Sequence, residues 1–297
     1  MPQSKTESFE GLERSCTTAQ DGRLIRGPDF PGLERLDARF AGTFFAPHRH
    51  DTYAVGLTLS GVQTFFYRGR QRTSLPGQIL VLHPDEMHDG AAASEEDLHY
   101  RMLYLDPLLV RETMDRAGTS LPFVAEPVVK DPAFRRIVAT GLDGLSEHME
   151  DVLADEIVAG ITRCLLRHAG RAPKPLGAIH TDGATRARDY LCETAPKNVT
   201  SHALERVSGL DRYSLSRHFR ALFGTSPHRF LTMRRLDMAR QRIETGMPLA
   251  EAAFAAGFSD QAHMTRHFKK AFGVTPGVWA RASVRTVVGS GRHKTGF

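Results

Sequence analysis

Apolar residues recur at helical spacing in the last hundred residues of the chain. In one segment they occupy positions i, i+4, i+7 and i+8: Leu215, Phe219, Leu222 and Phe223. The same pattern returns 49 residues later: Met264, Phe268, Ala271 and Phe272. A shorter apolar segment and a Gly-containing turn precede each stripe, and Asp211 and Ser259 stand where they can cap the longer helices. The pattern therefore predicts two helix–turn–helix units.

The two units share a short sequence motif. The first reads Arg217-His218-Phe219-x3-Phe223-Gly224-x2-Pro227, and the second reads Arg266-His267-Phe268-x3-Phe272-Gly273-x2-Pro276. Solenoid repeats need at least three copies to bury a core, so two copies indicate a duplicated small unit. A helix over about 230–245 is expected to join the units, and one chain would then contact two successive major grooves.

The second helix of such a unit lies in the major groove, so its polar face is expected to contact DNA. These residues are Tyr213, Ser214, Arg217 and Arg220 in the first unit, and Gln261, Ala262, His263, Arg266, Lys269 and Lys270 in the second. Mid-helix arginines can bind guanine in a bidentate way, whereas the lysines near the helix end are expected to meet phosphates. Two packed helices with a solvated basic face are the alternative interpretation, which the duplicated phrase disfavours.

Charge is distributed unevenly along the chain. Residues 181–283 hold 16 Lys and Arg against 9 Asp and Glu, whereas residues 1–180 hold 20 against 25. The formal net charge of +5 thus comes from the C-terminal part. A localised basic surface supplies the affinity for phosphates that DNA binding needs.

The segment 184–282 resembles the AraC/XylS family of transcription regulators, most specifically over residues 257–276. The stretch Arg234–Arg240 looks like the family's linker helix, and Phe254 replaces a smaller aliphatic, which we expect repacking to absorb. The resemblance implies double-stranded promoter DNA, a small-molecule effector and RNA polymerase as partners, an activator role, and a homodimer. Pairing would use the helices expected at 131–149 and 151–168, whose apolar stripe can also pack on its own domain.

Short apolar runs separated by glycine turns fill residues 22–106 and predict a small β-barrel or jelly roll. Its histidine spacing, Gly42-x5-His48-x-His50 and Gly77-x5-His83-x-Asp85-x2-His88, resembles the two cupin motifs. The usual glutamate ligand falls at Ala54, so we expect no metal, although a metal, a polar effector or purely structural histidines remain the three alternatives. The residues expected to contact an effector in the barrel are Arg39, His48, His50, Tyr53, His83, His88 and Tyr104.

These patterns predict a two-domain α+β protein, with a cupin-like barrel and dimerisation helices before an all-α double helix–turn–helix. Its expected parts are a flexible arm (1–21), a sensing and dimerisation domain (22–169), a linker (170–180), a DNA-binding domain (181–283) and a basic flexible tail (284–297). The alternatives are a cupin metalloenzyme fused to a DNA-binding domain, or a regulator controlled by abundance or a protein partner. The polar N-terminus, the isolated cysteines and the lack of an 18-residue apolar run indicate a cytoplasmic protein without membrane contact. No cofactor motif is present, so no cofactor and no enzymatic activity are expected.

Overall fold

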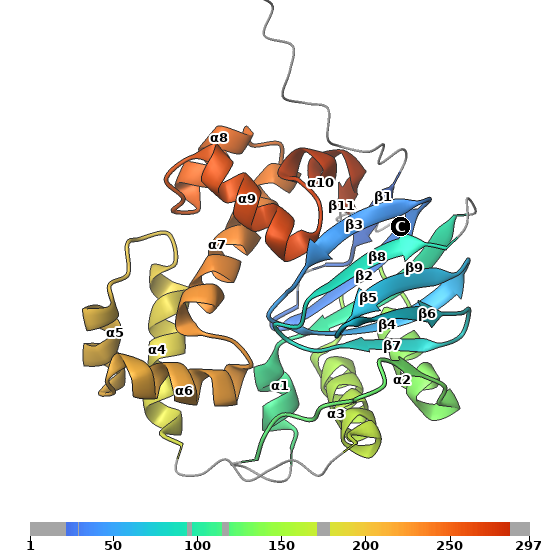
Figure 1. The fold of residues 1–297 in the computed structure, drawn as a ribbon, viewed down its shortest axis with the longest axis horizontal. Helices are drawn as coiled ribbons and strands as arrows, with labels where there is room; N and C mark the ends of the chain where they lie inside the picture. The colour runs from blue at the N-terminus through green and yellow to red at the C-terminus, as the bar shows by residue number, and fades with distance from the viewer. Residues whose placement is uncertain (1–21, 29, 94–96, 115–118, 171–178, 286–297) are drawn as a thin grey trace, which may run out of the picture.

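The computed structural model describes residues 22–285 except 29, 94–96, 115–118 and 171–178. Its N-terminal part is built on β-sheet and its C-terminal part is helical, as Figure 1 shows. The predicted fold class is therefore confirmed. The predicted arm lies outside the described residues, as do most of the linker and residues 286–297.

Two sheets form the N-terminal domain. The larger runs in the order β10-β7-β4-β9-β2-β1-β11, and the smaller in the order β3-β8-β5-β6. Their strands are β1 (Arg23–Arg26), β2 (Leu33–Phe40), β3 (Thr43–His48), β4 (Tyr53–Ser60), β5 (Gln63–Tyr67), β6 (Arg70–Ser74), β7 (Ile79–Leu82), β8 (His88–Ala92), β9 (Leu98–Leu105), β10 (Val128–Val129) and β11 (Ser283–Arg285). The short apolar runs of residues 22–106 therefore form strands, as the sequence predicted.

Side chains along the strands of the larger sheet point alternately to its two faces, and a hydrophobic core lies on each face. Ala54 on β4 faces the smaller sheet, whereas its neighbours Tyr53 and Val55 face the opposite side. Successive side chains of a strand point to opposite faces, so one strand can serve both cores. Three helices cover the outer face: α1 (Pro107–Glu112), α2 (Pro132–Leu142) and α3 (Asp151–His168).

One expectation about these helices is corrected, and for the other the structure shows one of the two alternatives. The helix expected at 131–149 ends at Leu142, because Asp143 adopts extended backbone and Gly144 follows at φ +51°. The apolar stripe of α3 is buried in its own domain, where Ile161 and Leu165 are fully enclosed. Burial on its own sheet thus accounts for a stripe that the sequence also allowed to pair subunits.

Seven helices form the described C-terminal domain: α4 (Thr181–Thr194), α5 (Ser201–Ser208), α6 (Arg212–Phe223), α7 (Pro227–Glu244), α8 (Leu249–Ala255), α9 (Gln261–Phe272) and α10 (Pro276–Ala282). The helix–turn–helix pairs are α5–α6 and α8–α9, and α7 lies between them in Figure 1. Both predicted stripes are buried, with Phe219 and Phe268 fully enclosed at equivalent positions.

The repeated Phe-Gly ends both recognition helices in the same way. Gly224 and Gly273 occupy the C-cap at φ +72° and +74°, a left-handed conformation that favours glycine. Asp211 caps α6 as expected, but the cap of α9 is Asp260 and not Ser259, since the Asp260 carboxylate accepts the His263 amide. Phe254, expected to be absorbed by repacking, is instead 66% exposed on α8.

The chain returns to the first domain at its end. Strand β11 pairs in parallel with β1, with Ser283 beside Leu24 and Arg285 beside Arg26. Residues 284 and 285 therefore extend the larger sheet, where the sequence indicated the start of a flexible tail. None of the described helices is long and apolar enough to cross a membrane.

Substitutions of two phenylalanines test the packing of the helical domain. Phe268→Ala should lower the free energy of unfolding by about 3–5 kcal/mol, because it empties a fully buried site. Phe254→Ala is the matched control, and it should change stability by less than about 0.5 kcal/mol because the ring is exposed. Urea denaturation measures both, and equal losses would contradict the assigned packing.

Candidate functional site at the junction of two domains

The residues expected to face DNA all lie at the protein surface. On α6, Tyr213 is 73% exposed, Arg217 and Arg220 are exposed, and Ser214 is half-buried. On α9 the exposed members are Gln261, Ala262, Arg266, Lys269 and Lys270, and His263 is half-buried. Each recognition helix thus buries its apolar stripe and presents a basic face, the arrangement that a helix needs to enter a major groove.

Three of the predicted histidines converge inside the barrel. The ring centroid of His88 lies 4.3 Å from that of His48 and 4.9 Å from that of His50. In each ring Nδ1 lies within 3.0 Å of a backbone carbonyl oxygen, so Nδ1 carries the proton and Nε2 offers a lone pair. Burial lowers the pKa of His50 and of His88 to about 3, and that of His48 well below its usual value, so all three are neutral at pH 7.

The metal-binding alternative finds little support in this geometry. Within the described part of the chain, no group of three His, Cys, Asp or Glu side chains is placed to hold a metal ion. Ala54 is paired with Tyr104 on β9 and is fully buried in the core between the sheets. A methyl group therefore occupies the position at which metal cupins carry the carboxylate.

Arg39, Tyr53 and His83, which were also predicted to contact an effector, lie apart from the three converging histidines. Arg39 is exposed and donates to His99. The Tyr53 hydroxyl donates to the Pro122 carbonyl at 2.8 Å, on the outer face of the larger sheet. His83 is satisfied at both nitrogens, by the Tyr67 hydroxyl and by the Val124 amide. These contacts are structural, and sequence spacing alone does not distinguish them from a lining role.

A small cavity of about 30 Å³ lies inside the barrel beside His48, His50, His88 and Tyr104, with room for little more than water. A second cavity of about 420 Å³ lies between the barrel and helices α4, α7, α9 and α10, and we call it the interdomain cavity. His48, His50 and Tyr104 line both spaces. The larger volume lies within the range of small-molecule sites.

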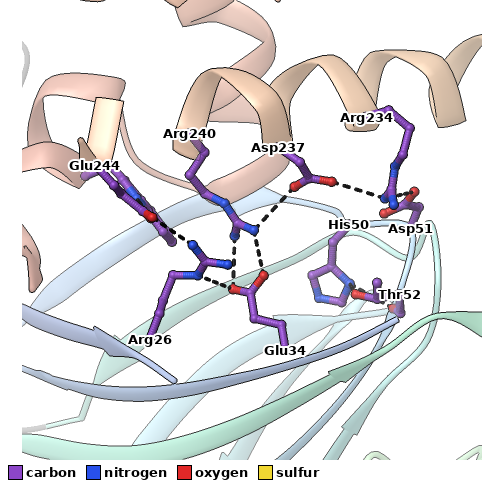
Figure 2. Close-up of polar contacts among 10 residues, drawn as sticks. Arg26, Glu34, His50, Asp51, Thr52, Arg234, Asp237, Arg240 and Glu244 are labelled. Carbon is purple, nitrogen blue, oxygen red and sulfur yellow. Dashed lines mark hydrogen bonds and ion pairs between the residues drawn. The ribbon is translucent and has the colours of Figure 1, made fainter. Parts of the chain in front are cut away.

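A chain of buried ion pairs crosses the interdomain cavity (Figure 2). Its centre is Glu34 on β2, which accepts from Arg240 on α7 at 2.6 Å and from Arg26 on β1 at 3.0 Å. Arg26 also pairs with Glu244 at 2.8 Å, and Arg234 pairs with Asp51 at 3.0 Å. Sequence analysis missed this network, because only the fold brings residues about 200 positions apart into contact.

The two carboxylates that face α7 have opposite electrostatic environments. Burial raises the pKa of Glu34, but Arg240 and Arg26 outweigh it and hold the value at about 2. Burial raises the pKa of Asp51 to about 6; Arg234 opposes this effect, and Asp237 and Asp106 add to it. Glu34 therefore strengthens docking above its ordinary pKa of 4.5, and this contribution is lost as the pH falls through about 2.

Both recognition helices are also bound at their C-terminal ends by the barrel domain. The backbone amides of Ala46 and Arg49 donate to the carbonyls of Gly273 and Lys270 at the end of α9. Arg111 on α1 donates to carbonyls of the last turn of α6, including Ala221 at 2.7 Å. Last-turn carbonyls lack partners within their own helix, so the first domain satisfies groups that would otherwise face water.

Comparison with known proteins agrees with this architecture. The AraC-like ligand binding domain matches residues 30–160, and a helix-turn-helix domain matches residues 204–282. The HTH-type transcriptional regulator YbfI of Bacillus subtilis is 27% identical over 248 residues, which cover 79% of this chain and 87% of that protein. The arabinose operon regulatory protein of Escherichia coli is 25% identical, with 87% and 92% covered.

ToxT of Vibrio cholerae has a similar fold. One of its structures superposes with a TM-score of 0.63 at 11% identity, covering 84% of this chain and 98% of ToxT. Other ToxT structures hold (E)-4-(8-methylnaphthalen-1-yl)but-3-enoic acid or an unsaturated fatty acid.

A ligand-binding barrel joined to two helix–turn–helix units defines a DNA-binding transcription regulator that responds to a small molecule. The chain belongs to the AraC/XylS family.

Removing the central carboxylate should loosen the two domains. Glu34→Gln leaves two buried guanidinium groups without their shared countercharge, and the expected loss is about 2–5 kcal/mol. Glu126→Gln is the matched control, because its 2.9 Å pair with Arg72 is 62% exposed on the acidic side and should contribute less than about 1 kcal/mol. Thermal unfolding at pH 7 measures both, and equal shifts would show that the Glu34 pairs contribute nothing to docking.

Proposed function

We propose that the protein reads promoter DNA with α6 and α9, and that a ligand in the interdomain cavity controls how the barrel holds these helices. One observation supports this above the others: the barrel domain donates hydrogen bonds to the last turn of both recognition helices. A change in the position of the barrel at the domain junction would therefore move both recognition helices, α6 and α9. The cavity borders α7, which joins them.

The energetic requirement for such control is modest. A ligand shifts the balance between a docked and a released arrangement only by the difference between its affinities for the two. Couplings of about 1–3 kcal/mol are typical of regulated proteins. Adding or removing one or two of the buried contacts at the junction supplies a difference of that size.

The effector site in this proposal is the interdomain cavity and not the closed barrel. His48, His50 and Tyr104 line it from the barrel side, and Figure 2 shows α7 above His50. Of the residues predicted for the effector, Arg39, Tyr53 and His83 are assigned structural roles. The polar arm expected at residues 1–21 lies outside the described residues.

Two further properties follow from family membership and belong to the proposal. We expect a homodimer and contact with RNA polymerase at an activated promoter. Because the stripe of α3 is buried within its own domain, pairing must use its outer surface, where Val152 is 71% exposed. Sedimentation of the wild type against Val152→Glu tests the dimer: a shift towards monomer supports this surface, and an unchanged dimer contradicts it.

An enzymatic role is the second candidate, and it receives no support from the arrangement of residues. A cupin oxygenase or isomerase needs a metal with an open coordination position. The position of its carboxylate is held by Ala54, and among the described residues no group of three His, Cys, Asp or Glu side chains is placed to hold a metal ion. Metal analysis of the purified protein tests this, since an enzyme of that kind would carry a stoichiometric transition metal.

The two mid-helix arginines should act as base readers. Arg217→Ala or Arg266→Ala should weaken specific binding by about 1–3 kcal/mol per guanine contact and leave non-specific binding almost unchanged. Lys270→Ala is the control for phosphate contact, and it should weaken binding to specific and random DNA alike. Titration of both DNAs at fixed salt distinguishes these cases. Equal losses on the two DNAs for the arginine variants would mean that they contact phosphates.

The effector response should depend on His50 and not on Tyr53. His50→Ala removes a side chain from the cavity floor, so reporter induction should be lost while DNA binding remains. Tyr53→Phe removes a buried hydrogen bond outside the cavity, so it should cost about 1–2 kcal/mol of stability and leave induction intact. Full induction in the His50 variant at normal protein level would place the effector elsewhere.

A further inference from the structure

The charged groups of the interdomain cavity contain one more acid than base. Among its described lining residues the carboxylates are Glu34, Asp51, Asp106 and Asp237, and the guanidiniums are Arg26, Arg234 and Arg240. Two partners outside the lining, Glu244 and Arg188, leave this excess unchanged. A buried excess charge is costly unless something neutralises it.

Each of the three lining guanidiniums is already paired with carboxylates, although the buried Nε atoms of Arg234 and Arg240 have no hydrogen-bond partner among the described residues. Arg240 is held by Glu34 and Asp237, and Arg234 by Asp51 and Asp237. Arg26 is held by Glu34 and Glu244. A carboxylate or phosphate entering the cavity would have to displace one of these buried partners. The terminal nitrogens that form these ion pairs are therefore committed, and an anion would compete for them with the carboxylates of the cavity.

An acceptor that has no partner lies at the cavity floor. His50 is 7% exposed, and its buried Nε2 has no hydrogen-bond partner among the described residues. Because Nδ1 lies 2.9 Å from the Thr52 carbonyl, Nδ1 is the donor and Nε2 presents a lone pair. Figure 2 shows this ring beside Asp51, beneath α7. A ligand that satisfies it must bring an N–H or O–H donor.

The remaining wall suits an apolar body with positive charge. Met233, Met238, Phe272 and Trp279 line it. The Arg240 guanidinium lies 5.1 Å from the Phe272 ring centroid and 5.5 Å from that of Trp279, so these two rings are already in contact with a cation of the protein, and the wall offers a ligand its apolar surface.

We propose that the interdomain cavity binds a small organic cation, an amine or guanidine carried on an apolar body, with its N–H groups on His50 Nε2 and the Asp51 carboxylate. This rests on the proposed function, in which occupation of the cavity sets domain docking. The proposal differs in charge from the carboxylic acids held by ToxT. A monocation neutralises the excess carboxylate and supplies donors without acceptors.

The proton on Asp51 should compete with this cation. The groups that face Asp51 are Arg234 and Asp237 from α7 and Asp106 ahead of α1, with Arg229 and Cys192 nearby. Since the pKa of Asp51 is about 6, the empty cavity resolves its excess charge by taking up a proton in mildly acidic solution. A cation should replace that proton, so its affinity should rise as the pH increases through 6.

The test uses the full chain and its single tryptophan, Trp279, which lines the cavity and reports binding by fluorescence. The probes are benzylammonium, benzyl alcohol and benzoate, which share one ring and differ in charge. We expect benzylammonium to bind at least tenfold more tightly than the other two at pH 7.5. Its dissociation constant should increase about tenfold at pH 5, the change in the ionised fraction of one carboxyl with a pKa of about 6.

Two variants test whether Asp51 is responsible for the preference for the cation. Asp51→Asn should abolish both the preference for the cation and its pH dependence. Asp37→Asn is the matched control, a buried carboxylate paired with Arg101 and His99 outside the cavity, and it should change neither. Tighter binding of benzoate, equal binding of the alcohol, no binding by any probe, or an undiminished cation preference in Asp51→Asn would each overturn the proposal.

Operator binding by the same preparations separates this inference from the function on which it rests. If the cation does not bind but the protein still protects its operator, the ligand class is wrong and the regulator stands. If the protein binds no DNA, the proposed function fails whatever the probes do.

Discussion

Glu34 is the constraint on which the arrangement of the two domains depends. It lies on a strand of the barrel, yet its partners include a helix more than 200 residues later in the chain. Arg240 and Arg26 are both at least 93% buried, so each needs a fixed countercharge to remain there. One carboxylate satisfies both, and it thereby positions α7, the helix that joins the two helix–turn–helix units.

The other contacts at the junction hold the ends of the two recognition helices. Backbone amides next to β3 bind the end of α9, and Arg111 binds the end of α6. Because helix ends carry unsatisfied carbonyls, they are natural docking points that leave the basic faces exposed. The barrel therefore constrains the positions of the readers without covering their DNA-facing residues. The barrel can therefore control the position of α6 relative to α9. This position matters because the two helices must enter two major grooves at the same time.

How much the sequence predicts depends on whether a feature is local. Helical periodicity, the Asp211 cap and the repeated Phe-Gly are short-range signals, and the structure has them where they were expected. The end of α2 at Asp143, the use of Asp260 in place of Ser259 and the exposure of Phe254 were missed, since each is decided by backbone conformation or packing. Spacing brought His48, His50 and His88 together correctly, because one motif fixes their strand positions. It could not exclude Tyr53, since a one-residue step along β4 moves a side chain to the other core.

Because the sequence predicts mainly local features, it did not predict the interdomain cavity. Its roof and floor come from different domains, and no periodicity links them. The proposed function places the ligand at the junction, in the larger of the two cavities. A ligand enclosed in the barrel would act on the readers only through intervening strands, each a further step at which free energy is dispersed. A ligand at the junction contacts α7 directly, so its differential affinity for the docked arrangement is the regulatory free energy itself.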